Sequence, residues 1–160
     1  MANTYTQIYI QTVFAVEHRQ CVIRREHQEE LHKYITGIVQ NLGHKLIAIH
    51  AMPDHVHILI GQKPAMSLSE LVQKVKADSS GFINRKRWVL GRFNWQEGYG
   101  AFSYGHSQLG AIIRYVENQE QHHARVSFRK EYLAFLKKFD VAYDAKYVFD
   151  FDALGAAVEQ

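Results

Sequence analysis

Apolar and polar residues alternate along residues 54–60, and this pattern predicts a β-strand with two different faces. Successive side chains on a strand point to opposite sides, so His55 and His57 share one face. The apolar residues of the other face are Val56, Ile58 and Ile60. The apolar face indicates contact with a hydrophobic core, and the opposite face carries two imidazole rings side by side.

The same kind of pattern predicts the remaining elements. Met52 and Pro53 alone separate the strands 45–51 and 54–60, so we expect an antiparallel hairpin there. Ser67 and Glu70 have the spacing of a capping box at the start of a helix. Residues 93–104 suit a strand or an extended loop. The other predicted elements are a strand over 8–16 and helices over 24–42, 68–83 and 109–122, with a fourth helix capped by Ser127.

The order of these elements predicts an α+β fold. Its first six elements give the βαββαβ order of a ferredoxin-like or RRM-like antiparallel sheet. In that architecture both crossover helices cover one face of the sheet and leave the other open. We therefore expect Val56 and its neighbours to face the crossover helices, and His55 and His57 to lie on the open face. The added helix 109–122 is the natural element to cover that face.

Length and composition limit the class of protein. A chain of 160 residues with 47% hydrophobic and 22% charged residues predicts one globular domain over 1–160, with a core of about 5–140 and an aromatic tail over 141–160 that docks onto it. No apolar run approaches the ~20 residues of a membrane span, and no signal-like segment begins the chain. We therefore expect an intracellular protein.

Cys21 is the only cysteine, which excludes a disulfide framework. The net charge of +3 permits a nucleic-acid partner without arguing for one.

Two sets of residues are candidates for chemistry. A divalent cation could bind His55 and His57 together, although two polar residues on a solvated sheet face are the ordinary explanation of such a pair. On the added helix, Tyr115 and Gln119 are four residues apart and so lie on the same side. They could reach the same site as the histidines, or they could be a tyrosine at the edge of the core and a solvated glutamine.

These segments together resemble a known family. His55-Val56-His57 looks like the His-hydrophobe-His motif of the single-tyrosine transposases of bacterial and archaeal insertion sequences, the two-hundred-like type. Residues 115–119 resemble that family's nucleophile helix. Further similar segments are Trp95-Gln96, Gly98-Tyr99, Phe102-Ser103 and residues 71–76. The resemblance runs in the right order from about Ile8 to Tyr147, and the ordered set is far more specific than the histidine pair alone.

The resemblance implies an enzyme that cuts and rejoins single-stranded DNA at insertion-sequence ends through a covalent 5′-phosphotyrosine. Tyr115 would be the nucleophile, and His55, His57 and Gln119 would bind one divalent metal, Mg²⁺ or Mn²⁺. Two imidazoles and an amide oxygen are neutral, so the metal would keep its full charge for the phosphate. The residues reveal no dedicated base for Tyr115.

The resemblance also implies partners and a location. The family acts on DNA hairpins as a homodimer, in which the tyrosine helix of one subunit can complete the metal site of the other. Gly105 and Gly110 flank the start of the helix that carries Tyr115, and we hypothesise that they form a hinge for this exchange. A loop glycine and a tolerated helix glycine explain them equally well. The protein would be cytoplasmic, associated with the nucleoid of a bacterium or archaeon, and would not bind membranes.

A basic cluster next to a tryptophan is the candidate DNA-binding surface. Positive charge beside an aromatic ring suits single-stranded DNA, although a solvated helix end explains the cluster equally well. Its residues are Lys74, Lys76, Arg85, Lys86, Arg87 and Trp88. Four other histidines are not expected to be metal ligands, and they are His50, His106, His122 and His123. Of these, His50 could lie beside the ligands, and the pair His122–His123 is expected to end a helix near its carbonyl groups.

Three alternatives remain open from the sequence. The first is a domesticated relative that processes chromosomal repeat hairpins without mobilising an element. The second is a ferredoxin-like module that binds single-stranded nucleic acid without catalysis, although such modules usually present aromatic rings on their central strands rather than histidines. The third, a replication-initiator or relaxase nuclease, shares the histidine motif but is usually larger and often has paired tyrosines.

Overall fold

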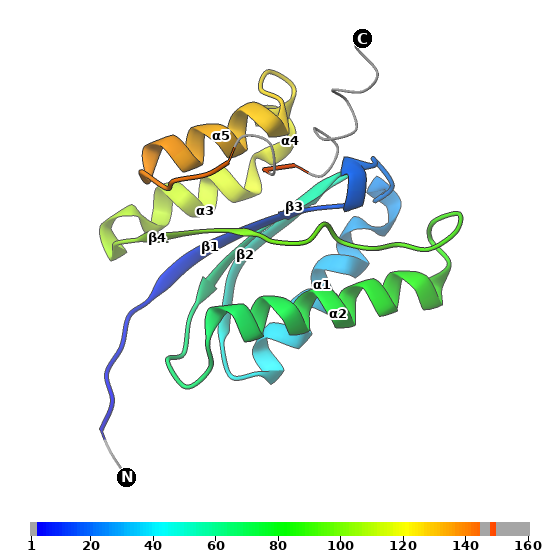
Figure 1. Cartoon of the computed structure of the whole chain (residues 1–160). Coiled ribbons are helices and arrows are strands. Elements are labelled where there is room, and N and C mark those ends of the chain that lie inside the picture. The colour runs from blue at the N-terminus through cyan, green and yellow to red at the C-terminus, as the bar shows by residue number, and fades with distance from the viewer. Residues whose placement is uncertain (1–2, 145–147, 150–160) are drawn as a thin grey trace.

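The computed structural model describes residues 3–144 and 148–149. An antiparallel sheet in the order β2-β3-β1-β4 lies between two layers of helices (Figure 1). The strands are β1 (Tyr9–Ala15), β2 (Lys45–Met52), β3 (His55–Gly61) and β4 (Gly100–Tyr104). The helices are α1 (Arg25–Asn41), α2 (Leu68–Lys86), α3 (Leu109–Glu117), α4 (Gln119–His123) and α5 (Phe128–Lys138), with 3₁₀ turns at Glu17–Arg19 and His106–Gln108. The predicted ferredoxin-like order is confirmed.

The tight connection between β2 and β3 sets the position of the histidine pair. Met52 pairs with His55 across the turn and His50 pairs with His57, so the predicted hairpin is confirmed. On its other edge β3 pairs with β1, where His57 lies opposite Val13. The histidines therefore lie on a central strand with a hydrogen-bonded neighbour on each side.

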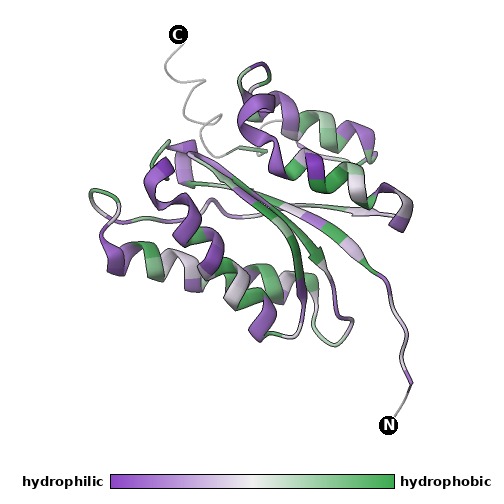
Figure 2. Ribbon diagram, turned by 180° about the vertical axis from the view of Figure 1, so that it is seen from behind, coloured by the Kyte–Doolittle hydropathy of each residue, from purple (hydrophilic) through white to green (hydrophobic). Residues whose placement is uncertain are grey.

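Helices α1 and α2 cover one face of the sheet, as the sequence predicts. Val56, Ile58 and Ile60 are each at most 1% exposed and pack in one core with apolar residues of the two helices. Those helix residues are Leu31, Ile35, Val39, Leu71, Val72, Val75 and Ile83. Figure 2 shows hydrophobic residues concentrated on the strands and on the helix surfaces turned toward them. Burial of this apolar stripe is the main stabilising term for the crossover helices.

The opposite face of the sheet is covered by α3 and α5. Val116 of α3 packs against Ala48 and Leu59 of the sheet, which confirms the expected position of this helix. Phe128 and Phe135 of α5 belong to a second cluster on the same face. The histidine face of β3 is consequently buried beneath helices rather than solvated.

Two helix starts are capped by serines. The Ser67 hydroxyl accepts a hydrogen bond from the Glu70 N–H at 3.1 Å, and the Ser127 hydroxyl accepts one from the Lys130 N–H at 3.2 Å. Both caps are where the sequence predicts them. Each satisfies a backbone donor that a helix leaves unpaired at its first turn.

Three sequence expectations need adjustment. The helix predicted over 109–122 is interrupted at Asn118, whose backbone leaves the helical region (φ −98°, ψ 25°), so Tyr115 lies on α3 and Gln119 begins α4. The predicted extended segment 93–104 forms a strand only over β4, preceded by an isolated bridge between Trp95 and Val16. In the predicted aromatic tail, Phe149 is buried against α5, whereas Tyr147 and Phe151 lie outside the described residues.

Within the described residues, none of the helices combines the length and the apolar character that crossing a membrane requires.

Candidate active site

Two histidines of β3 form the floor of the site. His55 and His57 are 1% and 0% exposed, and their ring centroids are 5.1 Å apart. They face α3, α4 and α5 because the alternation of the strand sends Val56 the other way. The face predicted for the pair is confirmed, and the ordinary explanation of two solvated polar residues is excluded by their burial.

Hydrogen bonds at Nδ1 orient both imidazoles. His55 Nδ1 lies 2.7 Å from Asp54 Oδ1, and His57 Nδ1 lies 2.7 Å from Gln11 Oε1. The Gln11 amide is itself oriented, because its Nε2 donates to the Tyr104 hydroxyl at 2.9 Å. Carboxylate and amide oxygens only accept, so both rings donate from Nδ1. Their Nε2 lone pairs are left free to face the interior of the site.

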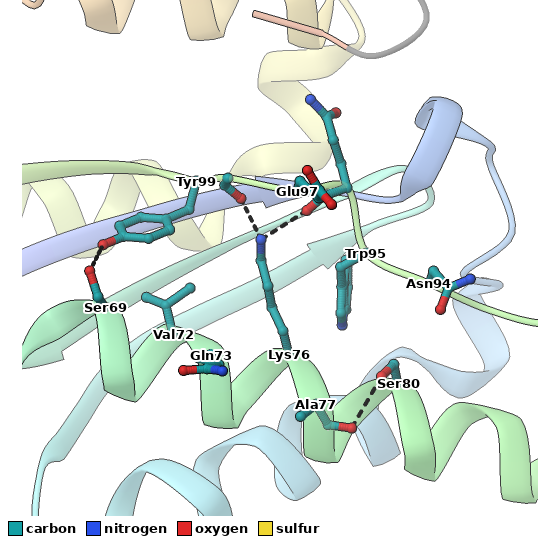
Figure 3. Close-up of a pocket in the computed structure, with 12 residues that line it drawn as sticks. Ser69, Val72, Gln73, Lys76, Ala77, Ser80, Asn94, Trp95, Glu97 and Tyr99 are labelled. Atoms are coloured by element: carbon teal, nitrogen blue, oxygen red, sulfur yellow. Dashed lines mark hydrogen bonds between the residues drawn. The ribbon is translucent and has the colours of Figure 1, made fainter.

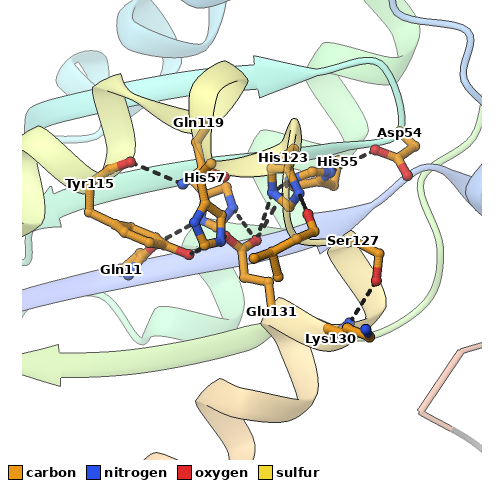
Figure 4. Close-up of polar contacts among 12 residues, drawn as sticks. Gln11, Asp54, His55, His57, Tyr115, Gln119, His123, Ser127, Lys130 and Glu131 are labelled. Atoms are coloured by element: carbon orange, nitrogen blue, oxygen red, sulfur yellow. Dashed lines mark hydrogen bonds and ion pairs between the residues drawn. The ribbon is translucent and has the colours of Figure 1, made fainter.

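Two residues that the sequence analysis did not select complete the cluster (Figure 4). Glu131 of α5 is buried, and its Oε1 lies 2.9 Å from His57 Nε2 and 3.1 Å from His123 Nε2. His123 Nε2 also lies 3.1 Å from His55 Nε2. His123 ends a helix, as predicted. Its ring nevertheless points into the cluster, whereas the sequence analysis expected His123 to lie apart from the candidate ligands.

Tyr115 reaches the same cluster from α3. Its hydroxyl donates a hydrogen bond to Glu131 Oε2 and lies 3.3 Å from His122 Nε2. Burial, followed by the negative charge of Glu131 and this hydrogen bond, raises the pKa of the Tyr115 phenol well above its usual range. The structure therefore brings Tyr115 together with His55 and His57 within one chain.

Gln119 lies above His57 with an incompletely satisfied amide (Figure 4). Its Nε2 donates to the Tyr115 carbonyl oxygen at 3.0 Å. Its Oε1 is buried and accepts no hydrogen bond within the described part of the chain. A buried oxygen without a donor is unfavourable unless a cation or water occupies the space before it. This observation fits the predicted role of Gln119 as an oxygen ligand.

The electrostatics of the cluster favour a cation. Burial lowers the pKa of His55 to about 4, so the ring is neutral near pH 7. Burial opposes ionisation of Glu131, but its close contacts with His123, His57 and Tyr115 outweigh it and lower the pKa of this carboxyl. Similarly, burial of Asp54 is outweighed by its contacts with His55 and Arg19, which lower its pKa. Imidazoles around a carboxylate are the donor types of a divalent metal site, and the donor atoms of His55, His57, His123 and Glu131 all lie within 4.8 Å of one another.

The sequence contains little signal for the residues that were missed. Asp54 directly precedes His55, so its contact could have been proposed from the strand start. Glu131 is in the first turn of a separate helix, where acidic residues are common for reasons of helix capping and dipole alone. Only the packing of α5 against the sheet reveals its role.

The predicted basic cluster is divided between two sides of α2. Lys76 Nζ donates to the carbonyl oxygens of Gln96, at 2.8 Å, and Gly98, and burial lowers its pKa to about 8 (Figure 3). Lys76 thereby holds the segment before β4 against α2, beside a cavity of about 440 Å³. Lys76 is therefore used in contacts within the protein, which separates it from the other residues of the predicted basic cluster.

Three other members contact α1. Arg85 donates to the Tyr34 hydroxyl at 3.3 Å, and Lys86 pairs with Glu30 at 3.0 Å. Trp88 stacks on the His27 ring, with centroids 4.2 Å apart. Lys74 and Arg87 are exposed. All of these residues lie on the face of the sheet opposite the histidine cluster, because α2 and α3 are in different layers (Figure 1).

The two glycines of the proposed hinge have ordinary backbones. Gly105 has φ −80°, and Gly110 is not among the described glycines with positive φ. A Cβ at Gly105 would meet only the end of the Gln108 side chain, at 3.8 Å. Neither position requires glycine in this conformation, and the hinge stays a prediction.

Comparison with known proteins identifies the family of this chain. The family model described as "Transposase IS200 like" matches residues 4–119, and the chain belongs to this family. The ISDra2 transposase TnpA of Deinococcus radiodurans is 24% identical over 118 residues, which are 71% of this chain and 84% of that protein.

Two solved structures share the fold. A crystal structure assigned to a transposase of Deinococcus radiodurans R1 aligns with a TM-score of 0.55 and 24% identity, over 74% of this chain and 96% of that one. A REP-associated tyrosine transposase bound to a REP hairpin aligns with a TM-score of 0.56 and 15% identity, over 90% of this chain and 91% of that one. The family match ends at Gln119, so His123 and Glu131 lie outside the matched residues.

Proposed function

We propose that this transposase cleaves and rejoins single-stranded DNA through a covalent 5′-phosphotyrosine at Tyr115, at a divalent metal held by His55, His57 and Gln119. The observation that supports this most strongly is the meeting of Tyr115 with the histidine pair at one carboxylate. Tyr115 donates to one oxygen of Glu131, and His57 lies 2.9 Å from the other. The nucleophile and the candidate metal site are therefore adjacent within one chain.

The residues suit reversible strand transfer. Attack by the Tyr115 oxygen on a phosphate would release a 3′-hydroxyl and leave the 5′-phosphate on the phenol. A phenol titrates near pH ~10 and leaves much more readily than an alkyl alkoxide, so a 3′-hydroxyl can reverse the reaction. The bound cation would neutralise charge that develops on the phosphate. The hydrogen bond to Glu131 keeps the Tyr115 hydroxyl directed at the cluster until substrate enters.

A route for the DNA strand lies along Tyr115. The tyrosine lines two cavities, one of about 440 Å³ between α3 and α5 and one of about 720 Å³ beside α4. Both cavities are lined by cationic side chains. The first cavity has Lys130 and Lys138, and the second has Arg114 and Arg125. Cations beside a cavity fit a phosphate backbone. We propose that the scissile phosphate enters this route as a single strand.

The proposed partner is a DNA hairpin, by analogy with the REP-associated relative whose structure contains one. The exposed basic residues of α2 are candidates for contacts with the hairpin, although they lie on the opposite face of the sheet from Tyr115. We further propose a homodimer that cuts two ends together, in the nucleoid of a bacterium or archaeon. Exchange of the tyrosine helix between subunits would require α3 to leave the position described here.

Processing of chromosomal repeat hairpins is a second candidate function. The REP-associated relative aligns with 90% of this chain, compared with 74% for the structure from Deinococcus radiodurans R1. The hairpin in the structure of that relative makes repeat hairpins a candidate substrate of this chain by analogy. Both candidates use the same chemistry at Tyr115.

A covalent-adduct assay tests the proposal. The protein is incubated with Mn²⁺ and a 3′-labelled single-stranded oligonucleotide that carries a hairpin, and the products are separated on a denaturing gel. We expect an adduct that disappears in Tyr115→Phe and in His55→Ala, and that is weak or absent with duplex DNA. An adduct that persists in Tyr115→Phe would show that another residue is the nucleophile. Hairpins with repeat or element flanks distinguish the two candidate functions.

A further inference from the structure

Three imidazoles in the cluster, rather than two, have Nδ1 engaged with an oxygen acceptor. Besides His55 and His57, His123 Nδ1 lies 2.7 Å from the Val126 carbonyl oxygen. A carbonyl oxygen only accepts, so this ring also donates from Nδ1. All three Nε2 lone pairs can then face the same space (Figure 4). This arrangement, in which each ring donates from one nitrogen and offers the other, is typical of metal-bound histidines.

Without a cation these atoms are poorly matched. His55 Nε2 and His123 Nε2 lie 3.1 Å apart, and Glu131 Oε1 lies 2.9 Å from His57 Nε2, 3.1 Å from His123 Nε2 and 3.8 Å from His55 Nε2. Three nitrogen lone pairs and a carboxylate oxygen contain no donor among them. These four separations lie on either side of the value of about 3.4 Å expected between the donor atoms of a tetrahedral metal with bonds of about 2.1 Å, and all the donor atoms lie within 4.8 Å of one another. A single divalent ion would satisfy all four atoms.

We propose that His123 and Glu131 are metal ligands together with His55 and His57, and that the site selects an imidazole-preferring ion such as Zn²⁺ or Co²⁺ over Mg²⁺. This inference rests on the proposed function and extends its metal site by two donors from beyond the family match at 4–119. Mg²⁺ prefers oxygen ligands and near-ideal octahedral geometry, whereas three imidazoles and one carboxylate suit borderline transition metals. Gln119 then adds an oxygen at the edge of the site rather than defining it.

The second oxygen of Glu131 links the ion to the nucleophile. Oε1 faces the three histidines, whereas Oε2 accepts from Tyr115 and lies 3.0 Å from His122 Nε2. One carboxylate thereby fixes the position of the tyrosine relative to the site. A proton on His123 Nε2 is the alternative to a cation in the space between the donor atoms. Glu131 favours this proton, because it raises the pKa of His123 against the opposing effect of burial.

Titration with metal in the absence of DNA distinguishes a cation bound by the four donors from a proton on His123. The apo-protein, prepared by chelation, is titrated with Co²⁺ while the visible absorption and the heat of binding are recorded. We expect Glu131→Gln to weaken Co²⁺ binding by at least about tenfold and to change the absorption spectrum. The matched control is Glu120→Gln, which makes the same change at an exposed residue of α4 and should bind Co²⁺ as the parent does. Equal Co²⁺ affinity in Glu131→Gln and the parent would overturn the proposal.

A measurement on the unaltered protein guards against misfolded variants. X-ray absorption at the Zn edge should report three imidazoles and a carboxylate, and about a hundredfold excess of Mg²⁺ should not displace the Zn²⁺. Only two imidazoles, no binding, or ready displacement by Mg²⁺ would each contradict the four-donor site. The adduct at Tyr115 is scored separately. Tight Co²⁺ binding without an adduct would refute the proposed function alone, and an adduct without the four-donor site would refute this inference alone.

Discussion

At the residue scale, the site depends on hydrogen bonds that orient the histidines. The alternation of β3 is sufficient to predict that His55 and His57 share a face, because period-two geometry is intrinsic to a strand. It is not sufficient to predict what holds their rings. Gln11 belongs to another strand, and Asp54 could equally have pointed to solvent. Contacts of this kind come from pairing and packing, which a single sequence specifies only indirectly.

Asp54→Asn tests the orientation of His55. The neutral amide is a weaker acceptor for the Nδ1–H of His55, so we expect Co²⁺ or Mn²⁺ affinity to fall by about 10- to 100-fold while the fold is retained. Isothermal titration calorimetry and circular dichroism provide the two readouts. Asp78→Asn, on the exposed surface of α2, is the matched control and should leave the affinity unchanged. Unchanged affinity in Asp54→Asn would remove this residue from the account of the site.

A buried histidine outside the site predicts a loss of stability in mild acid. His32 accepts a hydrogen bond at Nε2 from the Ala51 N–H at 2.8 Å, and burial, followed by nearby His50, lowers its pKa from 6.5 to about 4. The unfolded chain therefore takes up a proton first as the pH falls. The stabilising contribution is complete above pH 6.5 and is lost between pH 6.5 and about 4. After allowance for partial exposure, it is on the order of 1–2 kcal/mol.

His32→Gln isolates this effect from the other histidines. Glutamine keeps an acceptor for the Ala51 N–H but does not titrate in this range. Urea unfolding at several pH values should show a shallower loss of stability between pH 6.5 and 4 in the variant than in the parent, although His55 contributes to the remaining slope. Identical slopes would mean that folding does not lower the pKa of His32.

At the element scale, helix α5 links the core to the site. Its apolar residues pack on the sheet, and its first turn carries Glu131. The sequence predicts this helix through Ser127 and its apolar spacing, but not that it delivers a ligand. In the same way, the sequence predicts one helix over 109–122, but not that it is interrupted at Asn118 or that His123 at the end of α4 lies 3.1 Å from His55. Periodicity identifies helices well, whereas their relative placement depends on packing across the sheet.

The two serine caps provide a matched comparison of elements. Ser67→Ala and Ser127→Ala each remove one hydrogen bond at a helix start, and each should lower the free energy of unfolding by about 1 kcal/mol. Only Ser127→Ala should also weaken metal binding, because α5 holds Glu131 and α2 lies on the other face of the sheet. Urea unfolding and Co²⁺ titration measure the two effects. An equal loss of Co²⁺ affinity in both variants would show that the site responds to global stability rather than to α5.

At the scale of the whole molecule, the sheet separates two surfaces. The histidine cluster and Tyr115 lie under α3, α4 and α5, whereas the exposed basic residues of α2 lie beyond the opposite face (Figure 1). The sequence alone predicts the two layers, because the crossover helices of a βαββαβ fold share a side. It does not show that Lys76 is used internally. Nor does it show that lysines of α5 border the cavity at Tyr115.

This separation predicts distinct roles for the two basic surfaces. If the strand enters along Tyr115, Lys130→Ala combined with Lys138→Ala should weaken binding of a single-stranded oligonucleotide and reduce the slope of log affinity against log salt by about 1.4, which is about 0.7 per phosphate contact. Lys33→Ala on α1, where the lysine pairs with Glu29 at 3.4 Å, is the control and should leave that slope unchanged. Fluorescence anisotropy across a salt series measures both slopes.

Because neither Lys130 nor Lys138 belongs to the donor cluster, the Co²⁺ affinity of the double variant should stay at the parental value. This second measurement separates a loss of the DNA route from damage to the site. A double variant with the parental salt slope would place the strand elsewhere, and the exposed residues of α2 would then be the next surface to alter.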